Sequence, residues 1–189
     1  MARGIAERHD VIPTLGEIFR EYGFAGTSLA EITLRTGLGK GSLYHFFPNG
    51  KKEMAEVVLD DVANWFEDNV YLPLRESKNP KHGIKTMFKA VDDYFYSGER
   101  ICLIGAFSLD DTRDQFASKL NSYFTSWNEA LACALKRDGL ASKQAKDIAE
   151  DVVASIQGAL VLARSQDNPK VFTRALKRLQ KRIETCIHE

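Results

Sequence analysis

The chain has 189 residues, enough for one ordinary domain or for a small module joined to a larger one. Apolar residues make up 44% of it and charged residues 28%, proportions typical of a water-exposed protein with a sizeable core. Its formal net charge of zero excludes a polycation that binds nucleic acid with its whole surface.

Charge is unevenly distributed along the chain. Residues 1–52 hold seven Lys or Arg against five acidic residues, and residues 170–189 hold six against two. The segment between them therefore carries a net charge of −6. Basic ends around an acidic middle favour a protein that touches a polyanion through one module only.

The cysteines and the N-terminus bear on the cellular compartment. Cys102, Cys133 and Cys186 are odd in number, widely spaced and set in apolar runs, which fits core thiols in a reducing compartment better than disulfides or a zinc site. The chain starts without an apolar signal core, and no stretch reaches the ~20 apolar residues of a membrane span. We therefore expect a cytoplasmic protein with no metal, no cofactor and no membrane partner.

The first predicted helix is marked by an apolar stripe at helical spacing, formed by Val11, Leu15, Ile18 and Tyr22. Gly23 is expected to end it. Pro13 is unusual there, because a proline inside a helix costs ~3 kcal/mol. With Asp10 as N-cap, Pro13 would fall in the first turn, where no N–H bond is lost. We expect either that start or a kink at Pro13, and not a straight helix from Ile5.

Residues 27–47, TSLAEITLRTGLGKGSLYHFF, predict two short helices joined by a tight turn. Each has apolar residues on one face: Leu29 and Ile32 in the first, and Leu43, Phe46 and Phe47 in the second. Thr27 or Ser28 supplies the N-cap oxygen of the first helix, and Gly37 suits the left-handed position that ends it. The second helix begins with a cation and a hydroxyl between glycines, in Gly39-Lys40-Gly41-Ser42, so its outward end can press against a phosphate backbone or a groove floor.

Together with the preceding IFREYGFAG, this segment resembles the N-terminal DNA-binding segment of the TetR/AcrR family of transcriptional regulators. The resemblance covers residues 8–59 and depends on Thr27, Ile32, Gly37, Lys40, Gly41, Leu43, Tyr44 and Phe47 at the spacing of that family. Further along, CLIGAFSLDDTRD is similar to the LmrA/YxaF-like branch. The resemblance implies a three-helix DNA-binding module and repression of transcription until a small molecule binds.

The predicted DNA contacts divide into two groups. Residues that project from the second short helix reach base edges or phosphates, whereas those at the helix starts on either side contact phosphates and orient the protein without reading sequence. Tyr44 would donate its hydroxyl to a phosphate. The alternative is that Tyr44 and His45 only cover the small core, while the lysines that follow form a solvated helix end. The predicted set is Thr27, Ser28, Lys40, Gly41, Ser42, Tyr44, His45, Lys51 and Lys52.

Residues 51–189 are predicted to form a helical bundle, which makes the fold all-α with about nine helices. We divide the chain into a helix-turn-helix DNA-binding domain, residues 1–50, and a ligand-binding and dimerisation domain, residues 51–189. The bundle starts with a connecting helix that Pro73 ends or kinks. Asn79-Pro80 is a good cap and first-position pair for the next helix. The run ICLIGAF, residues 101–107, predicts a short buried helix or, as the less favoured alternative, a strand.

Three further helices complete the predicted bundle. The first follows apolar spacing from Thr112 to Asp138, Ser142 is expected to cap the second, and Asn168-Pro169 ends the second and starts the third. The belt of the second helix is too wide for one core and contains several alanines and Gly158, which indicates a partner, most simply a second copy of the chain in a four-helix interface. The alternative is that this belt packs inside the monomer. The predicted interface residues are Ile148, Val152, Ile156, Ala159, Leu160, Ala163, Phe172, Leu176, Leu179 and Ile183.

Apolar side chains from four separate helical segments predict a cavity for a small apolar or aromatic effector. The nearest polar candidates are Asp92, Asn128 and Gln157. The alternative is a packed core, which an aromatic stripe at helical spacing usually forms. The predicted lining is Trp65, Phe66, Phe88, Val91, Phe95, Phe107, Phe124 and Trp127.

No catalytic pattern is found. The four histidines are scattered, and the adjacent pairs Asp92-Asp93 and Asp110-Asp111 diverge by ~100° on a helix, so neither pair can share one site. We therefore predict no catalytic residue. The residues and the resemblance together favour a dimeric repressor that binds a palindromic operator. The alternative is a helical interaction module whose helix-turn-helix binds a protein, although the exposed cations of the second short helix favour a polyanion.

Overall fold

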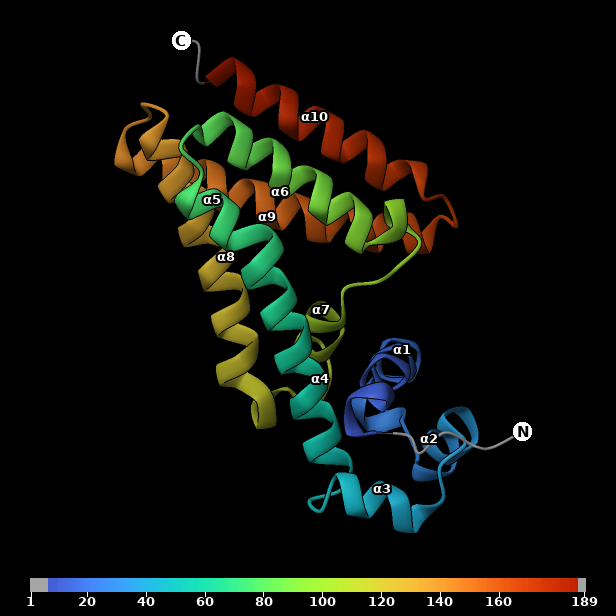
Figure 1. Ribbon diagram of the computed structural model, residues 1–189. Helices are drawn as coiled ribbons and strands as arrows, with labels where there is room; N and C mark the ends of the chain where they lie inside the picture. The colour runs from blue at the N-terminus through green and yellow to red at the C-terminus, as the bar shows by residue number, and fades with distance from the viewer. Residues whose placement is uncertain (1–6, 187–189) are drawn as a thin grey trace, which may run out of the picture. The chain divides into compact units, whose positions relative to one another are not determined.

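The computed structural model describes residues 7–186, and within this range the chain is helical with no β-strand (Figure 1). The all-α prediction is confirmed. Ten α-helices are found in the described part, and nine remain if α4 and α5, which are continuous through a π-helical segment, are counted as one. The chain forms two compact units, which we call the head (residues 7–63 and 103–120) and the body (residues 64–102 and 121–186).

The head is built around a small apolar core. Its elements are α1 (Arg8–Gly26), α2 (Leu29–Thr36), α3 (Lys40–Phe46), most of α4 (Lys51–Phe66), α7 (Leu103–Ser108), the 3-10 helix η3 (Arg113–Phe116) and the first turn of α8 (Ala117–Arg137). Side chains from five of these elements are completely buried in it, among them Leu15, Phe19, Ile32, Leu43, Met54 and Phe107. The apolar spacing that predicted the short helices is therefore the spacing that packs them together.

Helix α1 begins earlier than expected. It starts at Arg8 behind the N-cap Glu7, whose backbone N–H donates to the Asp10 carboxylate at 2.9 Å. Pro13 thus lies in the helix interior, and Gly23, not Pro13, is where the backbone leaves helical geometry. The expected start behind Asp10 was therefore wrong, and the backbone around Pro13 keeps helical φ and ψ. The proline is exposed, so water can reach the backbone carbonyl that its missing N–H leaves without a partner. The expectation at Ile5 lies outside the described residues.

The connecting helix does not end at Pro73. It continues from α4 through the π-helical segment η1 (Glu67–Tyr71) into α5 (Leu72–Glu76). The ring of a proline collides with the carbonyl four residues earlier, and the wider π-helical turn directly before Pro73 makes room for it. Gly83 of α6 packs closely here, since a Cβ on it would come within 2.6 Å of the Pro73 carbonyl oxygen.

The body continues with α6 (Pro80–Tyr94), the 3-10 helix η2 (Tyr96–Gly98), the rest of α8, α9 (Ser142–Ser165) and α10 (Lys170–Cys186). Helix α10 packs against both α6 and α9 (Figure 1). Asn79 caps α6 as predicted, accepting from the His82 N–H at 3.3 Å. Residues 103–108 form the predicted short helix, whereas the N-cap of α9 is Ala141 and not Ser142.

Two expectations about the chain as a whole can be compared with the described residues. Cys102 is buried, but Cys133 is exposed and Cys186 is half-buried, so only one of the three free thiols lies in the core. From Glu7 to Cys186, no helix combines the length and apolar character that crossing a bilayer requires.

Candidate nucleic-acid interface and effector site

The two short helices of the head have well-defined ends. The Ser28 hydroxyl accepts the Glu31 N–H at 3.1 Å and so caps α2, which decides between the two predicted caps. Gly37 ends α2 in the left-handed conformation, with φ 69° and ψ 8°, as predicted. Helix α3 then starts at Lys40, and its buried Leu43 anchors it in the core of the head.

Helix α3 turns a polar face outward. Lys40, Gly41, Ser42 and His45 are exposed, and Tyr44 keeps 46% of its surface accessible although it is a large aromatic residue. A Cβ on Gly41 would meet no atom within 4 Å, so the surface around it is open. This arrangement provides a cation, two hydroxyls and an imidazole on one short, anchored helix.

Two of the nine predicted contact residues are engaged inside the head instead. Thr27 is only 1% exposed, and its hydroxyl donates to the Gly23 carbonyl at 2.6 Å. The Lys51 ammonium donates to the carbonyls of Phe24 and Thr27, both at 2.8 Å, because the carbonyls at the end of α1 attract a cation. The Thr27 hydroxyl is therefore turned into the head, and two of the three N–H groups of the Lys51 ammonium are already bonded there. Lys52 is exposed, with a long ion pair to Glu56 at 4.0 Å.

Sequence reasoning missed several contacts that fix the head. Arg8 pairs with Glu53 at 2.8 Å and lies 5.1 Å from the centre of the Phe47 ring, and Arg35 of α2 pairs with Glu21 at 2.5 Å. Asp110 accepts the Ala25 N–H at 3.3 Å across 85 residues of sequence. No local pattern signals these pairs, because each depends on the tertiary fold.

All ten predicted interface residues are buried in the single chain, each with 8% or less of its surface exposed. The belt thus packs inside the monomer, as in the alternative interpretation. A different face of α9 stays exposed, with Ala154, Gly158, Val161 at 62% and Leu162 at 49%. It borders a groove of about 450 Å³ towards α10, which Arg178 and Arg182 also line.

The predicted lining of the effector cavity is mostly packed core. Phe107 belongs to the head, where its ring packs against Phe19 at 5.9 Å. In the body, Phe66 lies at the centre of an aromatic cluster, 5.3 Å from Trp127. The others that are buried are Phe88, Val91 and Phe95, while Trp65 and Phe124 are half-buried. Six of the eight predicted lining residues are therefore buried in a packed core, which is the alternative that the sequence left open.

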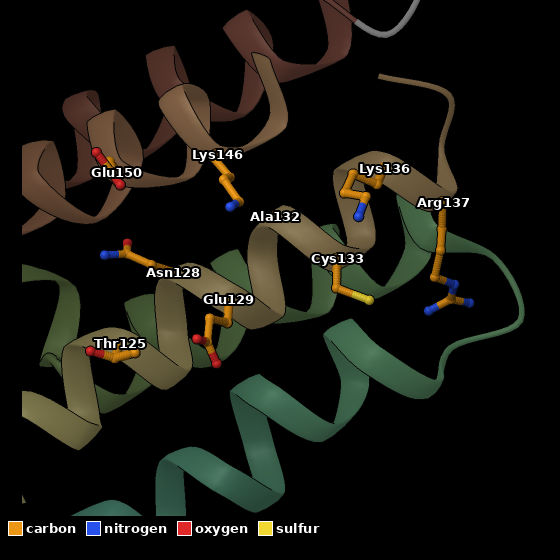
Figure 2. Close-up of a pocket in the computed structure, with 9 residues that line it drawn as sticks. All are labelled: Thr125, Asn128, Glu129, Ala132, Cys133, Lys136, Arg137, Lys146 and Glu150. Atoms are coloured by element: carbon orange, nitrogen blue, oxygen red, sulfur yellow. The ribbon is translucent and has the colours of Figure 1, made fainter. Parts of the chain in front are cut away.

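A groove of about 680 Å³ lies elsewhere in the body, over α8 and the first half of α9. Figure 2 shows Lys146 reaching from α9 into the space between the two helices, where Asn128 of α8 lies, while Glu129 and Cys133 project from α8 away from α9. The full lining is Thr125, Asn128, Glu129, Ala132, Cys133, Lys136, Arg137, Lys146 and Glu150.

The three predicted polar candidates of the body share one feature. Asp92 Oδ1, Asn128 Oδ1 and Gln157 Nε2 are buried and have no hydrogen-bond partner in the protein. A buried polar atom without a partner costs ~1–3 kcal/mol, so a ligand that hydrogen-bonds to it is favoured. Elsewhere in the body, burial raises the pKa of the Tyr71 and Tyr123 hydroxyls, which therefore stay neutral. In residues 7–186, no group of His, Cys, Asp or Glu is arranged to hold a metal ion.

Comparisons with known proteins agree with this geometry. The family model "Bacterial regulatory proteins, tetR family" matches residues 16–58, and "Transcriptional regulator LmrA/YxaF-like, C-terminal domain" matches residues 80–178, more than half of the chain. The chain belongs to the TetR family, in its LmrA/YxaF-like branch. It is a DNA-binding transcriptional regulator and not an enzyme.

Relatives of this TetR-family regulator match along most of its length. It is 28% identical to the uncharacterised regulator YxaF of Bacillus subtilis over 82% of this chain and 84% of that protein. It is 22% identical to the regulator LmrA of the same organism, over 85% and 88%. A crystal structure of a TetR transcriptional regulator from Legionella pneumophila has the same fold, with a TM-score of 0.81 at 17% identity over 94% of this chain and 98% of that one.

Proposed function

We propose that this regulator is a homodimer that binds a palindromic operator and represses transcription until a small effector releases it. The observation that carries the proposal is the exposed polar face of α3, which buried Leu43 anchors to the core of the head. The residues proposed to contact DNA are Ser28, Lys40, Gly41, Ser42, Tyr44, His45 and Lys52. Thr27 and Lys51 support them from inside the head.

Dimerisation is part of the proposed DNA-binding mechanism. One head offers about four or five phosphate contacts, too few for tight binding at physiological salt. Two heads in a dimer would bind a two-fold symmetric site with half-sites about 34–36 Å apart, or a multiple of that spacing. The exposed apolar face of α9, with Gly158, Val161 and Leu162, supports a symmetric interface there.

The effector is proposed to bind the groove over α8 and α9. Its volume of about 680 Å³ falls in the usual range for small-molecule sites. Asn128 lines it and offers a buried carbonyl oxygen without a partner, so the effector carries a hydrogen-bond donor. Binding that favours one orientation of the heads by ~1–3 kcal/mol suffices for release. A regulator that binds operator DNA would act in the cytoplasm, and we propose that location for this protein.

A salt titration of DNA binding tests this function. Labelled duplex from the region flanking the gene is titrated with protein, and the association constant is followed as salt rises. Binding should fall ~10³-fold or more between 50 and 200 mM salt, because each phosphate contact releases counterions. Lys40→Ala with Tyr44→Phe should weaken binding at unchanged Tm, whereas Lys143→Ala, an exposed lysine of the body, should not.

Two outcomes would reject the proposal. Absence of duplex binding at low salt would favour the alternative in which α3 binds a protein. A strictly monomeric chain would remove the two-fold operator. Effector binding is tested separately, since Asn128→Leu should abolish operator release by any compound that releases DNA from the wild type.

A further inference from the structure

Residues 23–27, at the end of α1, form the corner that leads into α2 and α3, the two short helices proposed to bind DNA. Gly23 interrupts α1 with φ 68° and ψ 179°, and one short turn leads from there to the Ser28 cap of α2. The Thr27 hydroxyl closes this turn by donating to the Gly23 carbonyl. The direction of α2, and of α3 behind it, therefore depends on how firmly these few peptides are held.

On the N–H side, the corner is held by Asp110, which follows α7. Asp110 Oδ2 accepts the Ala25 N–H at 3.3 Å, and the Phe24 N–H also donates to this carboxylate. The other oxygen, Oδ1, accepts the Thr112 N–H at 2.8 Å and the Thr112 hydroxyl. Thr112 thus fixes the orientation of the carboxylate towards the corner.

Gly23 is adapted to this contact. A Cβ on Gly23 would lie 3.1 Å from Asp110 Oδ2, and the positive φ is a conformation that other residues rarely adopt. Burial raises the pKa of Asp110, but the hydrogen bonds from Thr112, Ala25 and Phe24 outweigh it and hold the pKa below its usual value. The carboxylate is therefore charged when it binds the corner at neutral pH.

On the carbonyl side, the same corner is held by Lys51, the first residue of α4. Its ammonium bridges the carbonyls of Phe24 and Thr27 and lies 4.6 Å from the centre of the Phe24 ring. That ring packs in turn against Phe107 and Phe116, which flank Asp110 in the sequence. An apolar contact thus accompanies the polar ones.

We propose that Asp110 and Lys51 form a two-sided clamp on the α1–α2 corner, which makes Asp110 a positioning residue for DNA binding. An anion faces the N–H groups of the corner and a cation faces its carbonyls, so both charges match the peptide dipoles. The segment 103–120 belongs to the same compact unit as α2 and α3, and Asp110 hydrogen-bonds to the corner that precedes them. This inference rests on the proposed function, because it assumes that α3 reads DNA.

The test compares Asp110→Asn with Asp111→Asn. The first variant keeps the shape of the side chain but removes its charge and one acceptor oxygen. The second changes the neighbouring exposed aspartate, which alters the net charge of the protein equally. Duplex affinity at 25 °C should fall ~10-fold, or ~1.4 kcal/mol, for Asp110→Asn and stay at the wild-type value for Asp111→Asn.

A second readout separates positioning from general stability. Amide hydrogen exchange in Asp110→Asn should accelerate more at Phe24 and Ala25 than at the core amides of α1 around Leu15 and Ile18. If protection falls equally throughout the head, or if affinity is unchanged, the clamp is refuted. If the wild type binds no duplex, the proposed function fails instead.

If Asp110→Asn does not fold, the clamp is tested with the variant Thr112→Ala. It removes the hydroxyl that orients the carboxylate, together with the adjacent methyl group, and leaves the backbone N–H bond in place. A loss of affinity of ~3-fold at an unchanged Tm would support the clamp. Wild-type affinity in this variant would overturn it.

Discussion

The exposed apolar face of α9 leads to a quantitative prediction about the dimer. Burying a valine or leucine side chain completely is worth about 2 kcal/mol. Val161 is 62% exposed and Leu162 49%, so roughly half of that, about 1 kcal/mol, remains available from each. In a symmetric dimer four such side chains become buried, worth about 4 kcal/mol in total. Val161→Ser with Leu162→Ser should therefore raise the dimer Kd ~10³-fold.

Sedimentation equilibrium over a wide range of protein concentration measures this change. The matched control is Leu109→Ser, since Leu109 is 86% exposed but belongs to the head. Its dimer Kd should equal that of the wild type. Both proteins should keep wild-type helical content, because the altered side chains lie at the surface of the chain. An unchanged Kd in the double variant would show that the subunits associate through another face.

Three further predictions concern single residues. Lys51→Ala should destabilise the protein by ~1–3 kcal/mol in chemical denaturation, because two carbonyls lose a charged donor, whereas Lys52→Ala should have no effect. Gly83→Ala should lower the Tm by several degrees in circular dichroism, since the new Cβ would press against the Pro73 carbonyl oxygen; a wild-type Tm would mean that α5 and α6 can separate freely. The pKa of Asp110 is lower in the folded protein than the usual carboxyl value of ~3.9, so its charged form stabilises the fold above that pH. This stabilisation is lost as the pH falls through the pKa of Asp110 in the folded protein. Asp110→Asn should therefore make unfolding depend less on acid pH.

Local features of the fold were predictable from the sequence. Gly37 adopts the left-handed conformation that ends α2, and Asn79 caps α6. Each depends on atoms within four residues along the chain, so a short pattern contains the whole cause. Pro13 shows the boundary of this reasoning. The free-energy cost of a proline inside a helix follows from the sequence alone. The packing that keeps α1 continuous through Pro13, seen in the burial of neighbours such as Leu15, depends on the tertiary fold.

The burial of the predicted interface residues of α9 inside the single chain has a physical reason. Sequence periodicity identifies the strongest apolar stripe, and the chain buries that stripe first in its own core, as at Ile148 and Ile156. The face that stays exposed is the weaker one, with Gly158, Val161 and Leu162. Periodicity ranks faces by apolar content, whereas assignment to a core or to an interface depends on which neighbours the fold supplies.

Lys40 and Lys51 show most clearly what sequence could not distinguish in the candidate site. Each is a lysine at the first position of a helix, and both were predicted to contact DNA. The Lys51 ammonium donates to the carbonyl oxygens of Phe24 and Thr27, each 2.8 Å away, whereas Lys40 stays exposed. The two therefore differ in what their removal should change. Lys40→Ala should reduce the salt dependence of DNA binding at constant Tm, because it removes a phosphate contact, whereas Lys51→Ala should lower stability first and affinity only through the displaced corner.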